Sequence, residues 1–321
     1  YLSSRNEHFK ILKQQYLYLI GFKALIAMAL LVIGGVLVIN QTMNIGQFVA
    51  AEIIILLILS SVEKLIVSLE TVYDLFTAIE KIGQVTDLPL EDKEGMDIPH
   101  SELGFEIDFH NIRYENDLTS QTLLEGATFS INPNARAIFR TDNTVSTNLI
   151  FGLIAGIYNP KEGSLSINNI PLGNLNRTFL RNRIGNMLTQ DLLVHATVLE
   201  NITLGRDYVT FGEVQTLCDR LMLSKQIQHL KEGYDTLLNP EGHFLAKDCI
   251  RKILIARALV GSPKLILLEE PLQDIKVDER DAILNVILSP ENTTILIQTD
   301  DELIINRATN CITITQGNIL H

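Results

Sequence analysis

Residues 263–271 read PKLILLEEP, a short apolar run that ends on two adjacent carboxylates, Glu269 and Glu270. Taken alone, such a run is typical of a buried core strand with acidic residues at its exposed end. Other short segments predict further strands: 105–112, 127–131, 135–139, 163–168 and 293–297. Helical segments lie among the later ones: 147–157, 211–223 and 246–259. Strands alternating with helices imply an α/β domain with a largely parallel sheet covered on both faces.

The first part of the chain is its most apolar region. The stretch 15–39 is interrupted only by Lys23, and a second stretch, 45–65, follows a short uncharged turn and is broken by Glu52. About 20 apolar residues are needed to span a bilayer, so we predict a hairpin of two membrane-spanning helices. The alternative is a buried helical pair in a soluble bundle. We expect Glu52 to be solvated or interhelical, because it lies close to the outer interface, although intramembrane carboxylates often mark pathways.

Charge and composition limit the partners and the orientation. The net charge is −12, and the chain has no dense run of Lys and Arg, which argues against nucleic acid as a partner. Arg5, Lys10 and Lys13 precede the first predicted span. The positive-inside bias therefore places this flank, and everything after the second span, in the cytoplasm. The three cysteines lack metal-ligand spacing, and we expect buried, reduced thiols.

The pattern divides the chain into three parts. Residues 1–86 form a transmembrane fragment, whose second helix continues amphipathically beyond the membrane and ends near Gly83. Residues 87–104 form an acidic linker containing Pro and Gly. Residues 105–321 form the α/β domain. The chain lacks an initial Met and a signal peptide, so we expect that it is an N-terminally truncated piece of a longer protein.

Further segments stand in a characteristic order before the strand at 263–271. They are the strand 105–113 followed by Tyr114, ARAIF at 135–139, RTDNTVSTN at 140–148, MLTQD at 187–191, TVLENI at 197–202 and LAKDC at 245–249. In this order they resemble the ATP-binding domain of exporter-type ABC transporters over residues 105–321. NIGQFVA at 44–50 resembles the last two transmembrane helices of the same family. The resemblance implies an α/β P-loop-type nucleotide-binding domain, with a mixed sheet and a helical subdomain, after an all-α transmembrane hairpin.

The resemblance makes residues 140–148 the phosphate loop, whose family pattern is G-x-x-x-x-G-K followed by Ser or Thr. Arg140 and Val145 replace the glycines, Ser146 replaces the lysine, and Thr147 is retained. Glycine serves there because the loop needs positive φ and close approach of N–H groups to phosphate. Losing the lysine removes a charged donor worth about 1.5–3 kcal/mol, which predicts about 10- to 100-fold weaker binding. The helix that starts near Thr147 still offers N–H groups to an anion.

By the same resemblance, Tyr114 would stack on adenine, and Arg140, Asn143, Ser146, Thr147 and Asn148 would surround the phosphates. Alone, a tyrosine at a strand end or a glutamine in a loop is usually structural. Glu270 is the candidate general base, and Thr299 stands where a histidine is expected to contact the γ-phosphate. Mg²⁺ ligands in the family correspond here to Thr147, Gln190 and Glu269; Gln190 would also touch the attacking water.

The signature segment, L-S-G-G-Q in the family, reads Leu245, Ala246, Lys247, Asp248 and Cys249. It would hold the γ-phosphate of ATP bound by a second ABC subunit, so this chain departs from the pattern on both contact surfaces. Phosphoryl transfer depends on positioning and charge stabilisation, so we expect ATP and Mg²⁺ binding to be impaired and hydrolysis to be weak or absent.

Three hypotheses follow. In the first, the chain is an exporter subunit that pairs with a second ABC subunit, identical or different, and with further export-complex subunits. We expect it to lie in the lipid of a bacterial inner membrane, with its nucleotide-binding domain in the cytoplasm. Alternatively, it is a non-catalytic scaffold or regulatory subunit. In the third, the domain binds an anionic ligand other than ATP, and Arg140 supplies the positive charge that the missing lysine would have provided.

Overall fold

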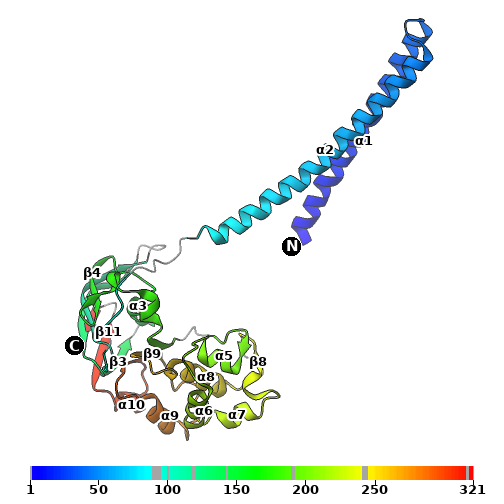
Figure 1. Cartoon of the computed structure of the whole chain (residues 1–321). Coiled ribbons are helices and arrows are strands. Elements are labelled where there is room, and N and C mark those ends of the chain that lie inside the picture. Colours follow the sequence, from blue (N-terminus) through cyan, green and yellow to red (C-terminus); the bar gives the residue numbers. More distant parts are fainter. Residues whose placement is uncertain are drawn as a thin grey trace. The chain divides into compact units, whose positions relative to one another are not determined.

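A computed structural model describes residues 2–88, 95–99, 101–116, 121–141, 144–188, 192–240, 245–315 and 318–320. The chain divides into two compact units, residues 1–91 and 92–321 (Figure 1).

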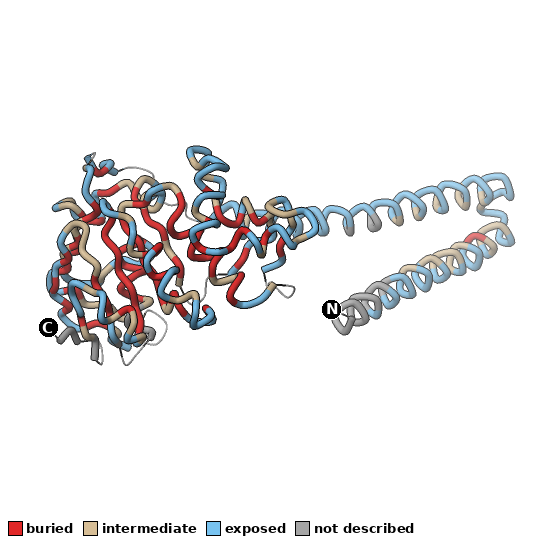
Figure 2. Tube along the Cα trace, turned by 90° about the horizontal axis from the view of Figure 1, so that it is seen from below, coloured by how far each residue is buried: buried red, intermediate tan, exposed pale blue. Residues whose placement is uncertain are grey.

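The first unit is a helical hairpin made of α1 (Leu2–Ile39) and α2 (Ile45–Thr86). The side chain of Asn44 accepts a hydrogen bond from the backbone N–H of Gln47, whose side chain accepts from the Asn44 backbone, and this capping box starts α2. Stretches 16–39 and 45–65 are long and apolar enough to cross a membrane, and most of their residues are exposed or half-buried (Figure 2). α2 continues three residues past Gly83, where we predicted its end.

Two contacts join the helices of the hairpin. Near the turn, Gly34 lies under the ring of Phe48, where a Cβ atom would approach within 2.3 Å of ring carbons. Farther from the turn, the Lys23 ammonium pairs with the Glu63 carboxylate. The pair lowers the cost of placing either charge at the edge of an apolar layer, since each charge neutralises the other.

The second unit contains two main sheets. Four antiparallel strands form one sheet in the order β2-β1-β4-β5: β2 (Thr122–Ile131), β1 (Ile107–Glu115), β4 (Glu162–Ile167) and β5 (Ile170–Pro171). Six strands form the other in the order β12-β11-β3-β10-β9-β6: β12 (Asn318–Leu320), β11 (Asn310–Thr315), β3 (Arg136–Thr141), β10 (Thr294–Gln298), β9 (Leu265–Glu269) and β6 (Ile184–Met187). β7 (Ala196–Thr197) and β8 (Leu237–Leu238) pair separately.

The parallel sheet confirms the expected α/β arrangement. All its neighbouring strands run parallel except β12, which is antiparallel to β11. The antiparallel sheet was not predicted as a separate layer. Its strands lie at 107–131 and 162–171, where the chain has few helical residues, and β1 and β2 alternate buried with exposed positions. Such alternation is typical of antiparallel strands with one covered face.

The helices of this unit are mostly short. They are α3 (Thr144–Ile154), α4 (Arg177–Arg181), α5 (Val198–Thr203), α6 (Phe211–Arg220), α7 (Ser224–Gln228), α8 (Lys247–Leu259), α9 (Arg280–Ile287) and α10 (Glu302–Ile305), with 3₁₀ turns at Leu172–Asn174 and Gly233–Asp235. The predicted helix 147–157 is shifted, because Gly156 adopts a left-handed φ of +70° and ends it early. The predicted helix 211–223 is shortened in the same way, since Met222 has a φ of +55°.

Two hydrophobic cores cover the two faces of the parallel sheet. Leu265, Leu267 and Leu296 face the core shared with α3 and the antiparallel sheet. Their neighbours Ile266 and Leu268 face the core built on α5, α6, α8 and α9. This alternation places buried side chains on both faces, as predicted for a parallel sheet. Figure 2 shows many buried segments within this unit.

The cysteine prediction is partly wrong. Cys218 and Cys249 are buried, whereas Cys311 is exposed on β11. All three are free thiols.

Candidate functional site

Several of the predicted site residues lie at the carboxyl edge of the parallel sheet. Glu269 ends β9, and its register partner on β10 is Gln298, whose other partner is Phe139 on β3. Arg140 follows Phe139 on β3, and Thr299 follows Gln298. Helix α3 begins just after β3. In open parallel sheets, ligands bind in crevices at this edge, so the topology gathers the candidate residues where a ligand would be handled.

Glu269 is buried, with 1% of its surface exposed. The Asn148 side chain, on α3, lies against its carboxylate. With the amide nitrogen facing the carboxylate, it donates to Oε1 at 3.1 Å and to Oε2 at 2.9 Å. The opposite orientation would set an amide oxygen against two carboxylate oxygens, so we assign the nitrogen to this side on hydrogen-bonding grounds. The sequence placed both residues in the site but did not predict that they contact one another.

Glu270 is held by β10 and the residues after it. Its backbone adopts a left-handed φ of +44°, and its N–H donates to the Gln298 carbonyl at 2.9 Å. Its carboxylate accepts from Thr299 Oγ1 at 2.9 Å and from the Asp300 N–H at 3.3 Å. Burial raises the pKa of Glu270, and the bonds from Thr299 and Asp300 oppose that rise. Thr299 thus supports the candidate base directly.

Two further acidic residues at this edge pair with arginines. Asp300 Oδ1 lies 3.6 Å from Arg140 Nε, and both side chains are largely exposed. Asp301 Oδ2 lies 2.9 Å from an Arg280 nitrogen. The Arg140 charge therefore already has an acidic neighbour, which weighs against the idea that Arg140 replaces the lost lysine for another anion. The exposed pair is weak, however, since such pairs contribute about 0–1 kcal/mol.

Tyr114 lies at the end of β1, in the antiparallel sheet. Its ring is half-buried and tilted by 58° against the ring of Tyr158, with centroids 5.8 Å apart. The tilted arrangement is a favourable one for two aromatic rings, so Tyr158 holds the Tyr114 ring in place.

Some predicted site residues lie outside the described parts. Asn143 and Gln190 fall in undescribed segments, and for Ser146 and Thr147 the structure gives only their backbone, in the first turn of α3.

The signature segment forms the start of α8, and the contacts of its side chains indicate a structural role. Ala246 precedes the helix and offers no side-chain cap, and Lys247 is exposed. Asp248 is 7% exposed, and its Oδ2 accepts a hydrogen bond from Gln226 at 2.8 Å. Cys249 is buried, which raises the pKa of its thiol to about 11. Leu245 is half-buried.

The Asp248 carboxylate belongs to a buried ionic network that sequence reasoning missed. Lys252 has no exposed surface, and its Nζ lies 2.5 Å from Glu279 and 3.9 Å from Asp248 Oδ2. Lys276 reaches the same Oδ2 from the exposed side, at 3.8 Å. The i,i+4 spacing of Asp248 and Lys252 was a visible signal, but Glu279 comes from a distant segment. A carboxylate at this helix start occupies the place where an anion would otherwise be favoured.

A second missed feature holds α8 to α5. The Arg257 guanidinium donates to the Asn201 carbonyl at 2.8 Å and to the Asn201 side-chain oxygen at 2.9 Å. The Asn201 amide in turn donates to the carbonyls of Val194, Ala196 and Thr197. The segment 194–201 and the helix α8 are thus joined by buried, fully paired polar groups.

The residues at Glu269 do not suit a magnesium ion. Mg²⁺ needs near-octahedral oxygen ligands at about 2.0–2.1 Å or through water. Here both carboxylate oxygens face amide hydrogens, whose partial positive charge opposes a cation. Among the residues that the structure describes, no group of three or more His, Cys, Asp or Glu side chains is placed to hold a metal.

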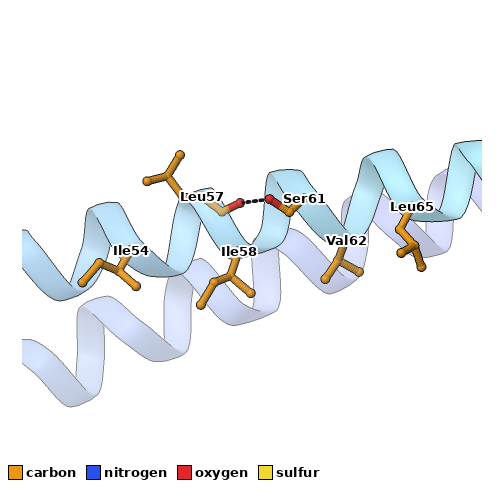
Figure 3. A pocket seen from close by; sticks show the side chains of 6 residues that line it. All are labelled: Ile54, Leu57, Ile58, Ser61, Val62 and Leu65. Atoms are coloured by element: carbon orange, nitrogen blue, oxygen red, sulfur yellow. Dashed lines mark hydrogen bonds between the residues drawn. The ribbon is translucent and has the colours of Figure 1, made fainter.

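An apolar groove lies on α2 of the first unit (Figure 3). It is lined by Ile54, Leu57, Ile58, Ser61, Val62 and Leu65. Ser61 Oγ donates to the Leu57 carbonyl at 2.9 Å, so its hydroxyl is satisfied within the helix. The groove offers no group for chemistry, and lies on a segment apolar enough for lipid.

Comparisons with known proteins agree with this arrangement. Residues 124–273 match the family model described as ABC transporter. The alpha-hemolysin translocation ATP-binding protein HlyB of Escherichia coli O157:H7 is 26% identical over 267 residues, covering 82% of this chain and 37% of that protein. The leukotoxin export ATP-binding protein LtxB of Aggregatibacter actinomycetemcomitans is 25% identical, covering 90% of this chain and 41% of that protein.

A solved structure, described as a bacterial Atm1-family ABC exporter with ATP bound, matches with a TM-score of 0.66 at 21% identity. It covers 77% of this chain and 43% of the solved chain. At this identity the likeness concerns the fold.

The second unit is therefore an ABC nucleotide-binding domain, preceded by two apolar helices, and its residues 124–273 match the ABC transporter family. Its curated relatives are ATP-binding proteins of exporters, and the chain spans about two-fifths of their length.

Proposed function

We propose that this chain is the C-terminal part of an ABC exporter subunit whose nucleotide-binding domain binds and hydrolyses ATP weakly or not at all. The family normally binds ATP and Mg²⁺ at the sheet edge described above. One observation carries the proposal: the two carboxylates of that edge are engaged by the protein's own side chains, Glu269 by Asn148 and Glu270 by Thr299.

The substitutions in the phosphate loop support the same conclusion. Val145 and Ser146 stand where the family has Gly and Lys. A β-branched residue resists the positive φ that brings backbone N–H groups to phosphate. Without the lysine, binding loses a charge-assisted bond of about 1.5–3 kcal/mol, which corresponds to about 10- to 100-fold in affinity.

The signature segment supports impairment on the second surface. In a head-to-tail pair, the start of α8 would face the phosphates bound by the partner subunit. Asp248 brings a buried negative charge to this position, held by Gln226 and Lys252. Lys252 and Lys276 both pair with this carboxylate, so the residue at this position serves an internal ionic network and offers no donor to a γ-phosphate.

In this proposal the hairpin crosses a bacterial inner membrane, and the nucleotide-binding domain lies in the cytoplasm. The basic flank before the first span supports this orientation. The subunit pairs with a second ABC subunit, identical or different, and further export-complex subunits are expected. The relatives named for toxin translocation and export suggest protein cargo.

The second candidate is a non-catalytic scaffold or regulatory subunit of a membrane complex. The buried network around Lys252 favours it, because this network stabilises the fold at the signature position without needing nucleotide. The two candidates share the fold and differ in turnover.

An ATPase assay on the purified assembly in lipid nanodiscs tests the proposal. The matched variant is Glu270→Gln, which keeps the shape of the side chain and its bond from the Asp300 N–H but removes the base. Slow turnover abolished by Glu270→Gln supports the exporter subunit with residual activity. Near-zero rates in both proteins support the scaffold. Turnover at the ordinary rate of about 1–10³ s⁻¹ would refute impairment.

A further inference from the structure

We propose that the Asn148 amide occupies the place of a divalent cation at Glu269, so that the carboxyl edge of this sheet binds no Mg²⁺. The inference rests on the proposed assignment of Glu269 to the nucleotide site. It goes beyond weak ATP binding, because it names the side chain that excludes the metal.

The geometry places the amide nitrogen in front of the carboxylate. Its distances to the two oxygens, 2.9 and 3.1 Å, are nearly equal, so the nitrogen lies close to the bisector between them. A cation bound through both oxygens, or a water linking a cation to them, would need this same space. The amide hydrogens supply positive potential there without a full charge.

The packing on both sides keeps the pair together. Asn148 is followed on α3 by Leu149 and Ile150, which are 4% and 0% exposed. Glu269 follows Leu268, which is also fully buried, and β9 lies between β6 and β10. Neither element can retreat without disturbing a close-packed core, so the contact is set by the fold.

The exchange has an electrostatic consequence. A divalent ion would reverse the charge at Glu269, whereas a neutral amide leaves it negative. Glu270 lies next to it in the sequence and carries a second carboxylate. A triphosphate entering without a cation would meet these two carboxylates, so exclusion of the metal and poor binding of ATP have one physical cause.

Binding of Mn²⁺, used as a paramagnetic stand-in for Mg²⁺, tests the inference on the full chain in nanodiscs. Electron paramagnetic resonance measures free Mn²⁺ with and without a non-hydrolysable ATP analogue. Asn148→Ser removes the amide and leaves a small hydroxyl that a cation tolerates. The matched control is the double variant Asn148→Ser/Glu269→Gln, which lacks the carboxylate as well.

We expect Asn148→Ser to bind Mn²⁺ at this site at least about 10-fold more tightly than the wild type, whose affinity should be the same as that of the double variant. The gain should disappear in the double variant. Mn²⁺ bound by the wild type and lost in Glu269→Gln would overturn the inference. Failure of Asn148→Ser to gain Mn²⁺ would overturn it too, since Asn148 would not then be what excludes the metal. If Asn148→Ser does not fold, Asn148→Thr replaces it under the same criteria.

The outcome is separable from that of the proposed function. A wild-type protein that binds Mn²⁺ at Glu269 but hydrolyses ATP slowly would contradict only this inference. Rapid turnover contradicts the proposed impairment, whatever the Mn²⁺ measurement shows.

Discussion

Replacing Lys252 by Met tests whether the signature segment has become a structural ionic network. Lys252 and Lys276 both lie near the same atom, Asp248 Oδ2, at 3.9 and 3.8 Å. They differ in exposure: Lys252 is 0% exposed and Lys276 is 59% exposed. The same Lys→Met substitution at the two positions therefore compares a buried lysine, which also pairs with Glu279, with an exposed one.

The expected magnitudes follow from this difference. Lys252→Met leaves the carboxylates of Asp248 and Glu279 close together with their shared buried cation gone. Breaking a buried ion pair from one side costs about 3–5 kcal/mol. Lys276→Met removes an exposed partner, which costs about 0–1 kcal/mol. For a domain of this size, about 2–4 °C of melting temperature corresponds to each kcal/mol.

Thermal unfolding of the full chain in nanodiscs, followed by circular dichroism, provides the measurement. Lys252→Met should lower the melting temperature by about 6–20 °C, and Lys276→Met by no more than about 4 °C. Circular dichroism before heating checks that both variants are folded. Equal shifts, or a stabilised Lys252→Met, would show that the buried network contributes no stability and would remove this support for a structural signature segment.

Three further predictions concern single groups. Burial raises the pKa of the Cys218 thiol to about 11, so iodoacetamide at neutral pH should modify the exposed Cys311 but not Cys218 in the folded protein, as mass spectrometry would show; equal labelling would contradict the fold around Cys218. Burial also raises the pKa of Glu270 above its usual 4.5, so the stability it contributes is present at low pH and lost as pH rises through the folded-state value. Glu270→Gln should therefore weaken the fall in melting temperature above pH 4.5, and an unchanged pH profile would count against that raised pKa. Gly185→Ala should destabilise the domain by about 3 kcal/mol in thermal unfolding, because the added Cβ would overpack the interior. That Cβ would lie 1.7 Å from a backbone oxygen of α8, whereas Gly173→Ala meets nothing within 4 Å and serves as the control.

The hairpin and the parallel core were readable from the sequence because each rests on a local pattern. A long apolar stretch predicts a helix of membrane-spanning length, and a helix of that length is present at each of the two stretches. Likewise, the run before Glu269 is apolar on every residue, which requires a strand covered on both faces. The order of the segments then indicated the family.

The contacts that decide the site were not readable, since they join residues far apart in the chain. Asn148 meets Glu269 because the start of α3 and the end of β9 reach the same sheet edge. Thr299 reaches Glu270 only because β9 and β10 are neighbours in register. A lone Asn or Thr carries no signal of its partner.

The sequence by itself determined which groups are present at the nucleotide edge and which are missing, because identity and order along the chain suffice for that. Only the tertiary structure decided how the remaining carboxylates are satisfied. Hydrogen bonds act over about 3 Å, and strand order and helix packing alone bring such distant groups within that reach.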